Sequence, residues 1–346
     1  MSEMKRYDPL SSVFYHLGRM EENAETLKLW WSGSGLVMRA KCGRIDVEAE
    51  STARNHAQFL GVMIDGAPVC RLPLAPGKHV YPVLAGMLNE AYHEITILRD
   101  TQPSYDEDGP VILHVVYTDG EMEAPAPKDT VIEFIGDSLT VGEGTVGPKS
   151  GMEWILPYIS HMPAFPTLAS VMLDAEKRVV ALGGWGAYKS WDGKHECRIG
   201  AIYERLCAVT PGGDTPYSFH ERPADYVVIN LGTNDGTALK DLPAEEKKKE
   251  EVLFTRDAEA LLALVRAHQP KACILWAYGL CGSVMEKGIR KAVEQRQSAG
   301  DGRVAYLPLP EAKDVGSRMH PSQEAHLEAA RTIADAIRAW KGENEA

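Results

Sequence analysis

Three side chains that acyl transfer requires lie just after apolar runs, or in a loop, in the part of the chain that follows residue 130. Ser138 belongs to the sequence Gly-Asp-Ser-Leu after the apolar run 131–135, and Asn234 belongs to Gly-Thr-Asn-Asp after the run 226–231. His320 precedes a proline and a serine in a loop ahead of the last helical pattern. A hydroxyl becomes a nucleophile when a base takes its proton, and the developing oxyanion needs N–H donors. The chain therefore holds a candidate nucleophile, base and donor, provided that the fold brings them together.

Alternating strand-like and helix-like segments predict that these side chains share one edge of a sheet. Apolar runs occur at 131–135, 179–182, 226–231, 272–277 and 304–307, and helical spacing appears between the later ones. This alternation is typical of a parallel sheet covered by helices on both faces. Ligands bind at the carboxyl ends of the strands in such sheets. Gly183 and Gly184 follow the second run, so their N–H groups also belong to the predicted site.

From about residue 27 to 120 the chain shows the period-two alternation of β-strands instead. The segments 36–42 and 45–50 alternate, and Gly43-Arg44 between them predicts a hairpin turn. Asp65-Gly66 predicts another hairpin, and 92–99 and 111–118 are predicted strands. Strands at this spacing favour a β-sandwich or jelly roll. The polar, proline-containing stretch 120–130 predicts a domain boundary. We expect a β-sandwich domain over 1–127 and a catalytic domain over 128–346.

Composition and charge argue against several classes of function. The 346 residues carry a net charge of −12, so neither a nucleic acid nor an anionic membrane is an expected partner. No run of about 18 apolar residues is present to span a membrane, and the start of the chain lacks an apolar signal core. The six cysteines are scattered without a Cys-x-x-Cys pattern. These features favour reduced thiols and a cytoplasmic location, and they give no support for a metal site or a cofactor.

In chain order, Gly136-Asp137-Ser138-Leu139, Gly184, Gly232-Thr233-Asn234-Asp235 and His320-Pro321-Ser322 resemble the four sequence blocks of the SGNH (GDSL-like) hydrolase superfamily. This resemblance covers about 130–346 and implies a flavodoxin-like, three-layer α/β domain with a parallel sheet. The β-domain directly ahead of it makes the whole chain similar to the two-domain carbohydrate esterase family 2, in which a jelly roll precedes the hydrolase domain. Trp276-Ala277-Tyr278-Gly279 and the spacing from His320 to His326 also resemble that group. Members of this family remove acetyl groups from plant polysaccharides such as xylan and mannan.

The resemblance implies a role for each motif residue. Ser138 corresponds to the nucleophile and His320 to the general base. The implied oxyanion hole consists of the backbone N–H groups of Ser138 and Gly184 together with the side-chain amide of Asn234. No metal or cofactor enters this chemistry.

The sequence departs from the superfamily at the third member of the triad. The superfamily usually carries an aspartate two or three positions before the catalytic histidine, where this chain has Arg318 and Ser317. Some members of the family work as a Ser-His dyad in which a backbone carbonyl orients the imidazole, and we favour that arrangement here. Asp314 or Glu311 replaces the missing acid only if the loop folds back, because the carboxylate must reach the far ring nitrogen.

Other residues near the predicted site have both a functional and a structural interpretation. Trp185 and Tyr278 are the candidate substrate-binding residues. The remaining expectations are Trp191 as a weaker cleft candidate, Trp276 in the core, Asp137 and Asp235 as caps or loop anchors, His326 as a support of the His320 loop, and 147–165 as an irregular lid or oligomer contact.

The leading hypothesis is a serine carbohydrate O-acetylesterase whose partner is an acetylated oligosaccharide of the xylan or mannan type. A second hypothesis is a glycan-binding protein with a degenerate hydrolase domain, because the triad acid is missing. A third is a metal-dependent phosphoesterase using Asp137, Asn234 and His320, for which too few further ligands are visible. Among esterases, a thioesterase or lipase also stays open.

Overall fold

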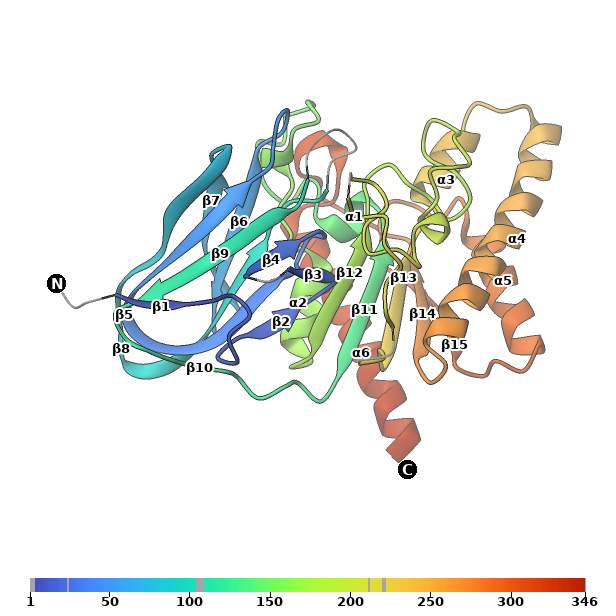
Figure 1. The fold of residues 1–346 in the computed structure, drawn as a ribbon. Coiled ribbons are helices and arrows are strands. Elements are labelled where there is room, and N and C mark those ends of the chain that lie inside the picture. Colours follow the sequence, from blue (N-terminus) through green and yellow to red (C-terminus); the bar gives the residue numbers. More distant parts are fainter. Residues whose placement is uncertain (1–3, 24, 104–108, 211, 220–221, 346) are drawn as a thin grey trace.

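The computed structural model describes residues 4–345 except 24, 104–108, 211 and 220–221. An antiparallel β-domain, blue to cyan in Figure 1, is followed by a parallel α/β domain. This order confirms the predicted fold class. Among these residues no helix is both long enough and apolar enough to cross a membrane. All six cysteines lie in the described part of the chain, and all are free thiols.

The β-domain is built on two long strands that bend together. Its strands are β1 (Lys5–Tyr7), β2 (Tyr15–Leu17), β3 (Met20–Asn23), β4 (Thr26–Leu29), β5 (Gly35–Ser51), β6 (Gln58–Ile64), β7 (Ala67–Leu74), β8 (Gly77–Arg99), β9 (Val111–Thr118) and β10 (Glu121–Glu123). The main path runs β3-β4-β9-β5-β8-β6-β7, with β1 paired to β9 and both β2 and β10 paired to β5. Apolar side chains from both halves of β5, such as Met38 and Val47, enter one core.

The predicted hairpin at Gly43-Arg44 is wrong. Strand β5 runs straight through these residues, with register shifts against β8 on both sides of Cys42. The Asp119 carboxylate accepts the N–H groups of Gly43 and Arg44, each at 2.9 Å, so the strand bends at a bulge instead of reversing. The hairpin at Asp65-Gly66 is confirmed, since both residues have positive φ (49° and 78°) between the paired strands β6 and β7.

The α/β domain contains one five-stranded parallel sheet, in the order β12-β11-β13-β14-β15. The strands are β11 (Val131–Gly136), β12 (Glu176–Ala181), β13 (Tyr226–Asn230), β14 (Cys273–Tyr278) and β15 (Val304–Pro308). The helices are α1 (Ser138–Val141), α2 (Phe165–Met172), α3 (Thr233–Leu239), α4 (Ala244–His268), α5 (Glu286–Ser298) and α6 (Gln323–Glu345), with 3-10 turns η1 (Leu156–Tyr158), η2 (Ile199–Ala201) and η3 (Ser317–Met319). This is the flavodoxin-like strand order, in which the carboxyl ends of the strands form the binding edge.

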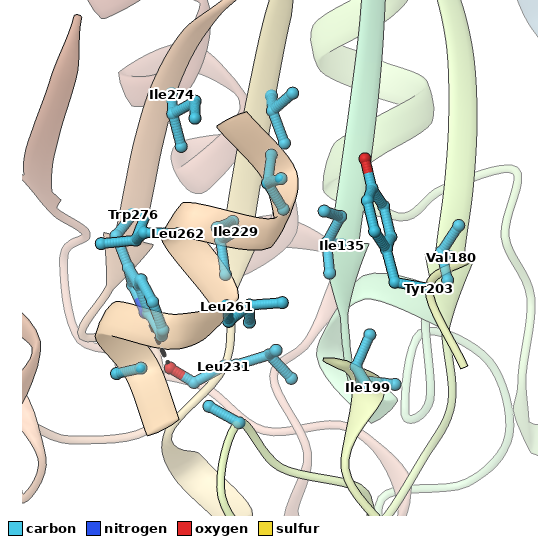
Figure 2. Packing of buried hydrophobic residues seen from close by; sticks show 14 of the residues in the cluster. Ile135, Val180, Ile199, Tyr203, Ile229, Leu231, Leu261, Leu262, Ile274 and Trp276 are labelled. Carbon is cyan, nitrogen blue, oxygen red and sulfur yellow. Dashed lines mark hydrogen bonds between the residues drawn. The ribbon is translucent and has the colours of Figure 1, made fainter. Parts of the chain in front are cut away.

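Two apolar layers hold the sheet between its helices. Helices α4 and α5 pack on one face and α2 and α6 on the other. Figure 2 shows Ile229 and Ile274 of the sheet next to Leu261 and Leu262 of α4. Full burial of each such side chain stabilises the fold by about 1.5–3 kcal/mol. Trp276 lies in this layer and donates its indole N–H to the Leu231 carbonyl at 3.0 Å, which confirms its core assignment.

A buried carboxylate joins the two domains directly below the predicted site. Asp100, just after β8, accepts hydrogen bonds from Arg71 Nε (2.6 Å), the Ser160 hydroxyl (2.8 Å) and the backbone N–H groups of His161 (2.8 Å) and Met162 (3.0 Å). Its side chain is fully buried, and burial raises its pKa. Ser160 in turn donates its N–H to the Gly142 carbonyl, which lies at the end of α1. The β-domain therefore fixes the loop on which α1 rests.

Other polar contacts across the junction are also buried. Arg19 of the β-domain pairs with Glu133 of β11 at 3.1 Å, and the Tyr203 hydroxyl donates to the same carboxylate at 2.5 Å. Trp31 donates its indole N–H to the Leu206 carbonyl at 2.6 Å. These contacts are specific hydrogen bonds and an ion pair between fixed partners, so they favour one relative position of the two domains.

Replacing Asp100 with alanine is expected to lower the free energy of unfolding by about 3 kcal/mol or more, since the partly buried Arg71 guanidinium loses its carboxylate and the Ser160 hydroxyl and the Met162 N–H lose their acceptor. Urea denaturation measures this change. Asp335→Ala on the exposed side of α6 serves as the control and is expected to change it by about 0.5 kcal/mol or less. Equal stability of the two variants contradicts the role given to Asp100.

Candidate active site

Ser138 begins α1 one residue after strand β11 ends, so it lies at the carboxyl edge of the sheet. Asp137 caps this helix by accepting the Leu139 N–H at 3.0 Å. Gly136 has to lack a side chain, because a Cβ there would come within 1.9 Å of the Thr140 hydroxyl oxygen. The Gly-Asp-Ser sequence is therefore a tight strand-to-helix turn that places a largely buried serine in the lining of the cleft.

The structure brings Ser138 and His320 together, although 182 positions separate them in the chain. The Ser138 hydroxyl and His320 Nε2 are 3.0 Å apart, which is hydrogen-bond distance. The other ring nitrogen, Nδ1, lies 3.0 Å from the Arg318 carbonyl oxygen. A carbonyl accepts only, so Nδ1 carries the ring proton and Nε2 is left free to accept the serine proton.

The loop that presents this carbonyl has a strained backbone. Arg318 and Met319 have φ of 54° and 57°, a region that side chains other than glycine rarely adopt. This turn directs the Arg318 carbonyl back to its own histidine. Neither acidic alternative takes that place, since Asp314 pairs with Lys149 at 2.6 Å and Glu311 is exposed.

The three predicted oxyanion donors lie around the same cleft. Within the described residues, the N–H groups of Ser138 and Gly184 donate to no protein acceptor, and Gly184 has a φ of 83°. Asn234 differs, because its side-chain amide already donates to the Trp185 carbonyl at 2.8 Å and to Asp137 Oδ2 at 3.2 Å. An oxyanion can receive a bond from Asn234 only by replacing one of these acceptors, and the longer contact with Asp137 is the weaker one.

Two buried aspartates anchor the loops of the site, as the sequence predicts. Asp235 accepts the N–H groups of Ala187 (3.0 Å), Tyr188 (2.8 Å) and Lys189 (2.9 Å), and so fixes the chain after Gly184. Burial raises the pKa of Asp235. It also raises the pKa of Asp137 to about 7, and the neighbouring carboxylates add to this effect.

The cleft above Ser138 has a volume of about 730 Å³. Its wall combines aromatic and polar side chains, formed by Glu143, Trp154, Trp185, Ser190, Trp191, Asp192, Lys194, Cys197 and Arg318 around the Ser138–His320 pair. Trp185 lines it as predicted, although little of its surface is accessible. Trp191 is 59% exposed at the same cleft.

Tyr278 is a correction, because it does not line the cleft. Its ring is 2% exposed, and its hydroxyl accepts the Met285 N–H at 3.4 Å. The neighbouring Gly232 lies close enough that a Cβ there would be 3.0 Å from the ring. The tyrosine ends strand β14, but it points into the core beside α5.

His326 supports the site from behind. It is fully buried, its Nδ1 accepts the Phe165 N–H at 3.2 Å, and its ring stacks on that phenylalanine. Burial lowers its pKa to about 3, so the ring is neutral. His326 thus connects α6 to Phe165 at the end of the segment 147–165. The same segment contacts the His320 loop, because the Gly151 carbonyl accepts the Arg318 N–H at 2.7 Å.

Sequence reasoning missed two residues of this site. Glu143 follows the nucleophile by five positions, and its carboxylate lies 2.5 Å from Arg318 Nε and 3.7 Å from His320 Nε2. Gln102 comes from the β-domain and accepts the Gly183 N–H at 2.9 Å, next to Gly184, whose N–H is a predicted oxyanion donor. A carboxylate between two glycines was a visible signal for Glu143. Nothing in the sequence indicated that Gln102 reaches the second domain.

Two family models match the chain in succession. Residues 16–127 match the model described as carbohydrate esterase 2 N-terminal. Residues 134–344 match the GDSL-like lipase/acylhydrolase family.

Individual relatives match this chain over most of its length. The solved structure of an acetyl xylan esterase, Est2A, from the rumen bacterium Butyrivibrio proteoclasticus is 25% identical, with a TM-score of 0.93 over 99% of both chains. An acetylxylan esterase / glucomannan deacetylase of Cellvibrio japonicus is 24% identical over 93% of this chain and 87% of that protein. Cellulase/esterase CelE of Acetivibrio thermocellus is 25% identical over 89% of this chain, but the match spans only 37% of CelE.

Asp137 is expected to make stability depend on pH. With a pKa of about 7, against an ordinary 3.8, the folded protein keeps a proton that the unfolded chain loses above pH 4. Asp137 thus lowers the free energy of unfolding as the pH rises from about 4 to about 7, by up to about 4 kcal/mol. The free energy of unfolding of Asp137→Asn minus that of the parent protein is therefore expected to increase as the pH rises from about 4 to about 7. Above about pH 7 this difference is expected to stay constant.

Urea denaturation of both proteins between pH 4 and 8 measures the difference, with Asp241→Asn at an exposed position as the control. A difference that does not vary with pH contradicts the raised pKa.

Proposed function

Because the chain belongs to the GDSL-like lipase/acylhydrolase family and carries a carbohydrate esterase 2 N-terminal domain, we propose that it is a carbohydrate O-acetylesterase. The observation that carries this proposal is the Ser138–His320 contact of 3.0 Å at the floor of an open cleft. An esterase of this family needs a serine and a base in contact, and the described site supplies both.

The proposed reaction has two steps through an acetyl-enzyme. His320 Nε2 takes the hydroxyl proton while Ser138 Oγ forms a bond to the acetyl carbon. The resulting tetrahedral intermediate breaks its bond to the sugar oxygen, and the imidazolium returns the proton to that oxygen. A water molecule then attacks the acetyl-enzyme with His320 again as base, and acetate and free Ser138 result. The Arg318 carbonyl keeps the imidazole in the required tautomer throughout.

The oxyanion is proposed to bind the N–H groups of Ser138 and Gly184, both without another protein acceptor in the described chain. Asn234 is proposed as the third donor, at the cost of its 3.2 Å contact with Asp137. Each preorganised donor of this kind contributes about 3–4 kcal/mol to lowering the barrier. Asn234 is the least preorganised of the three.

The substrate is proposed to be an acetylated oligosaccharide of the xylan or mannan type. The cleft supports this because an exposed tryptophan, Trp191, offers a flat apolar face for a sugar ring beside polar groups such as Asp192 and Lys194. The names of the similar acetylxylan and glucomannan esterases point to the same class. The glycan-binding alternative loses its main argument, since a carbonyl occupies the place of the missing triad acid.

Ser138→Ala is expected to reduce the kcat for an aryl acetate by about 10³-fold or more, because among the described residues only the Ser138 hydroxyl hydrogen-bonds to His320 Nε2 and can act as the nucleophile. Chromophore release measures the rate, and thermal unfolding checks that the fold is kept. Ser190→Ala, which removes another hydroxyl of the same cleft, is the matched control and is expected to keep most of the activity. Turnover that survives in Ser138→Ala excludes this serine as the nucleophile.

Trp191→Ala is expected to raise the KM for acetylated xylan or mannan oligosaccharides several-fold while leaving the kcat/KM for a small aryl acetate nearly unchanged, because only the longer substrate reaches the exposed ring. Mass spectrometry of the oligosaccharides before and after treatment counts the acetyl groups removed. Loss from one polysaccharide class and not the other identifies the substrate class. If aryl acetate is hydrolysed and neither oligosaccharide loses acetyl groups, the carbohydrate assignment is wrong and another ester is the substrate.

A further inference from the structure

We propose that Glu143 is a positioning residue that supplies, from the loop of the nucleophile, the negative charge that the missing triad acid would have supplied from the loop of the histidine. This inference rests on the proposed function, because it concerns how His320 acts as a base. It goes further by giving a role to a buried carboxylate that neither the motifs nor the dyad mechanism uses.

The backbone fixes Glu143 relative to the nucleophile. Its N–H donates to the carbonyl of Ser138 itself at 2.9 Å, directly after the four-residue helix α1. The side chain is buried and lines the cleft. A buried carboxylate needs partners, and those of Glu143 are the two groups on which the base depends.

The two carboxylate oxygens face different atoms of the histidine loop. Oε1 accepts from Arg318 Nε at 2.5 Å, and Oε2 lies 3.7 Å from His320 Nε2. Arg318 is also the residue whose carbonyl accepts from His320 Nδ1. The ion pair therefore holds Arg318, whose left-handed backbone directs its carbonyl to the ring. The second oxygen places negative charge beside His320 Nε2, the nitrogen that becomes protonated.

Glycines on three sides leave room for this arrangement. A Cβ on Gly183 would be 3.3 Å from Glu143 Oε2, and one on Gly144 would be 2.4 Å from the Cβ of His320. A Cβ on Gly316 would come within 1.9 Å of the Gly144 carbonyl oxygen. The loops of the nucleophile and of the base thus pack backbone against backbone, which brings Glu143 within reach of both.

The charges around His320 agree with this role. Glu143 and Arg318 form the pair in the cleft, the buried His326 behind the ring is neutral, and Asp314 on the same loop is paired with Lys149. Without Glu143, Arg318 loses the carboxylate that pairs with it, and His320 Nε2 loses the negative charge that lies 3.7 Å away. The imidazolium that forms when Ser138 attacks is then less favourable, and kcat falls.

The test compares Glu143→Gln, which keeps the shape but removes the charge, with Glu143→Asp, which keeps the charge on a shorter side chain. Asp314→Asn is the control, because it removes a carboxylate from the same loop that does not face the ring. For an aryl acetate, Glu143→Gln is expected to lower kcat by about 10²-fold with KM changed less than about twofold. Glu143→Asp is expected to recover part of that loss, and Asp314→Asn to resemble the parent protein.

A second measurement does not depend on turnover. NMR titration of the His320 ring is expected to show a lower pH midpoint in Glu143→Gln than in the parent protein, and an intermediate one in Glu143→Asp. An unchanged midpoint in a folded Glu143→Gln protein, or a loss confined to KM, overturns the role of Glu143. If Glu143→Gln does not fold, the same comparison is made with Glu143→Asp, where kcat and midpoint equal to those of Asp314→Asn overturn it. Absence of Ser138-dependent turnover in the parent protein overturns the proposed function instead, whatever the midpoint.

Discussion

The buried carboxylate of Asp100 is the constraint on which the site depends. It lies at the end of the longest strand of the β-domain and takes hydrogen bonds from the loop 160–162 of the other domain. That loop holds the end of α1, and α1 begins with Ser138, the proposed nucleophile. A carboxylate without water must keep all its donors, so the β-domain and the serine loop have one relative position. Gln102, two residues further, extends the same control to Gly183.

Orientation and charge are provided by different groups in this active site. In a triad, one carboxylate both orients the histidine and stabilises its protonated form. Here the Arg318 carbonyl orients His320, and it is held by a backbone turn in a costly conformation. The nearest carboxylate approaches the opposite nitrogen and is tied to the arginine that forms the turn. The strained turn at Arg318 and the partly buried Glu143–Arg318 ion pair therefore belong to one arrangement.

Most of the sequence-based expectations that failed rested on a short sequence pattern that is compatible with two different local structures. Gly43-Arg44 suits a turn, but the Asp119 carboxylate binds both N–H groups and makes a bulge. Tyr278 ends a strand near the cleft. Successive side chains of a strand point to opposite faces of the sheet, and the Tyr278 ring lies on the face that packs in the core. Asp314 has the right chemistry for a triad, but its carboxylate pairs with Lys149, and the Arg318 carbonyl is the partner of His320 Nδ1. Each outcome depends on a partner distant in sequence, which local spacing does not reveal.

The sequence by itself indicated the two-domain order, the parallel sheet and the placement of Ser138, Gly184 and Asn234 at the carboxyl ends of its strands. Periodicity and strand ends suffice for that, because the carboxyl ends of parallel strands must meet. Only the tertiary structure decided what orients the imidazole, which carboxylate lies beside it and that a residue of the β-domain reaches the oxyanion loop. These contacts join segments more than 80 positions apart or turn on a single backbone angle. Their energies arise from burial and close packing, which exist only once the chain has folded.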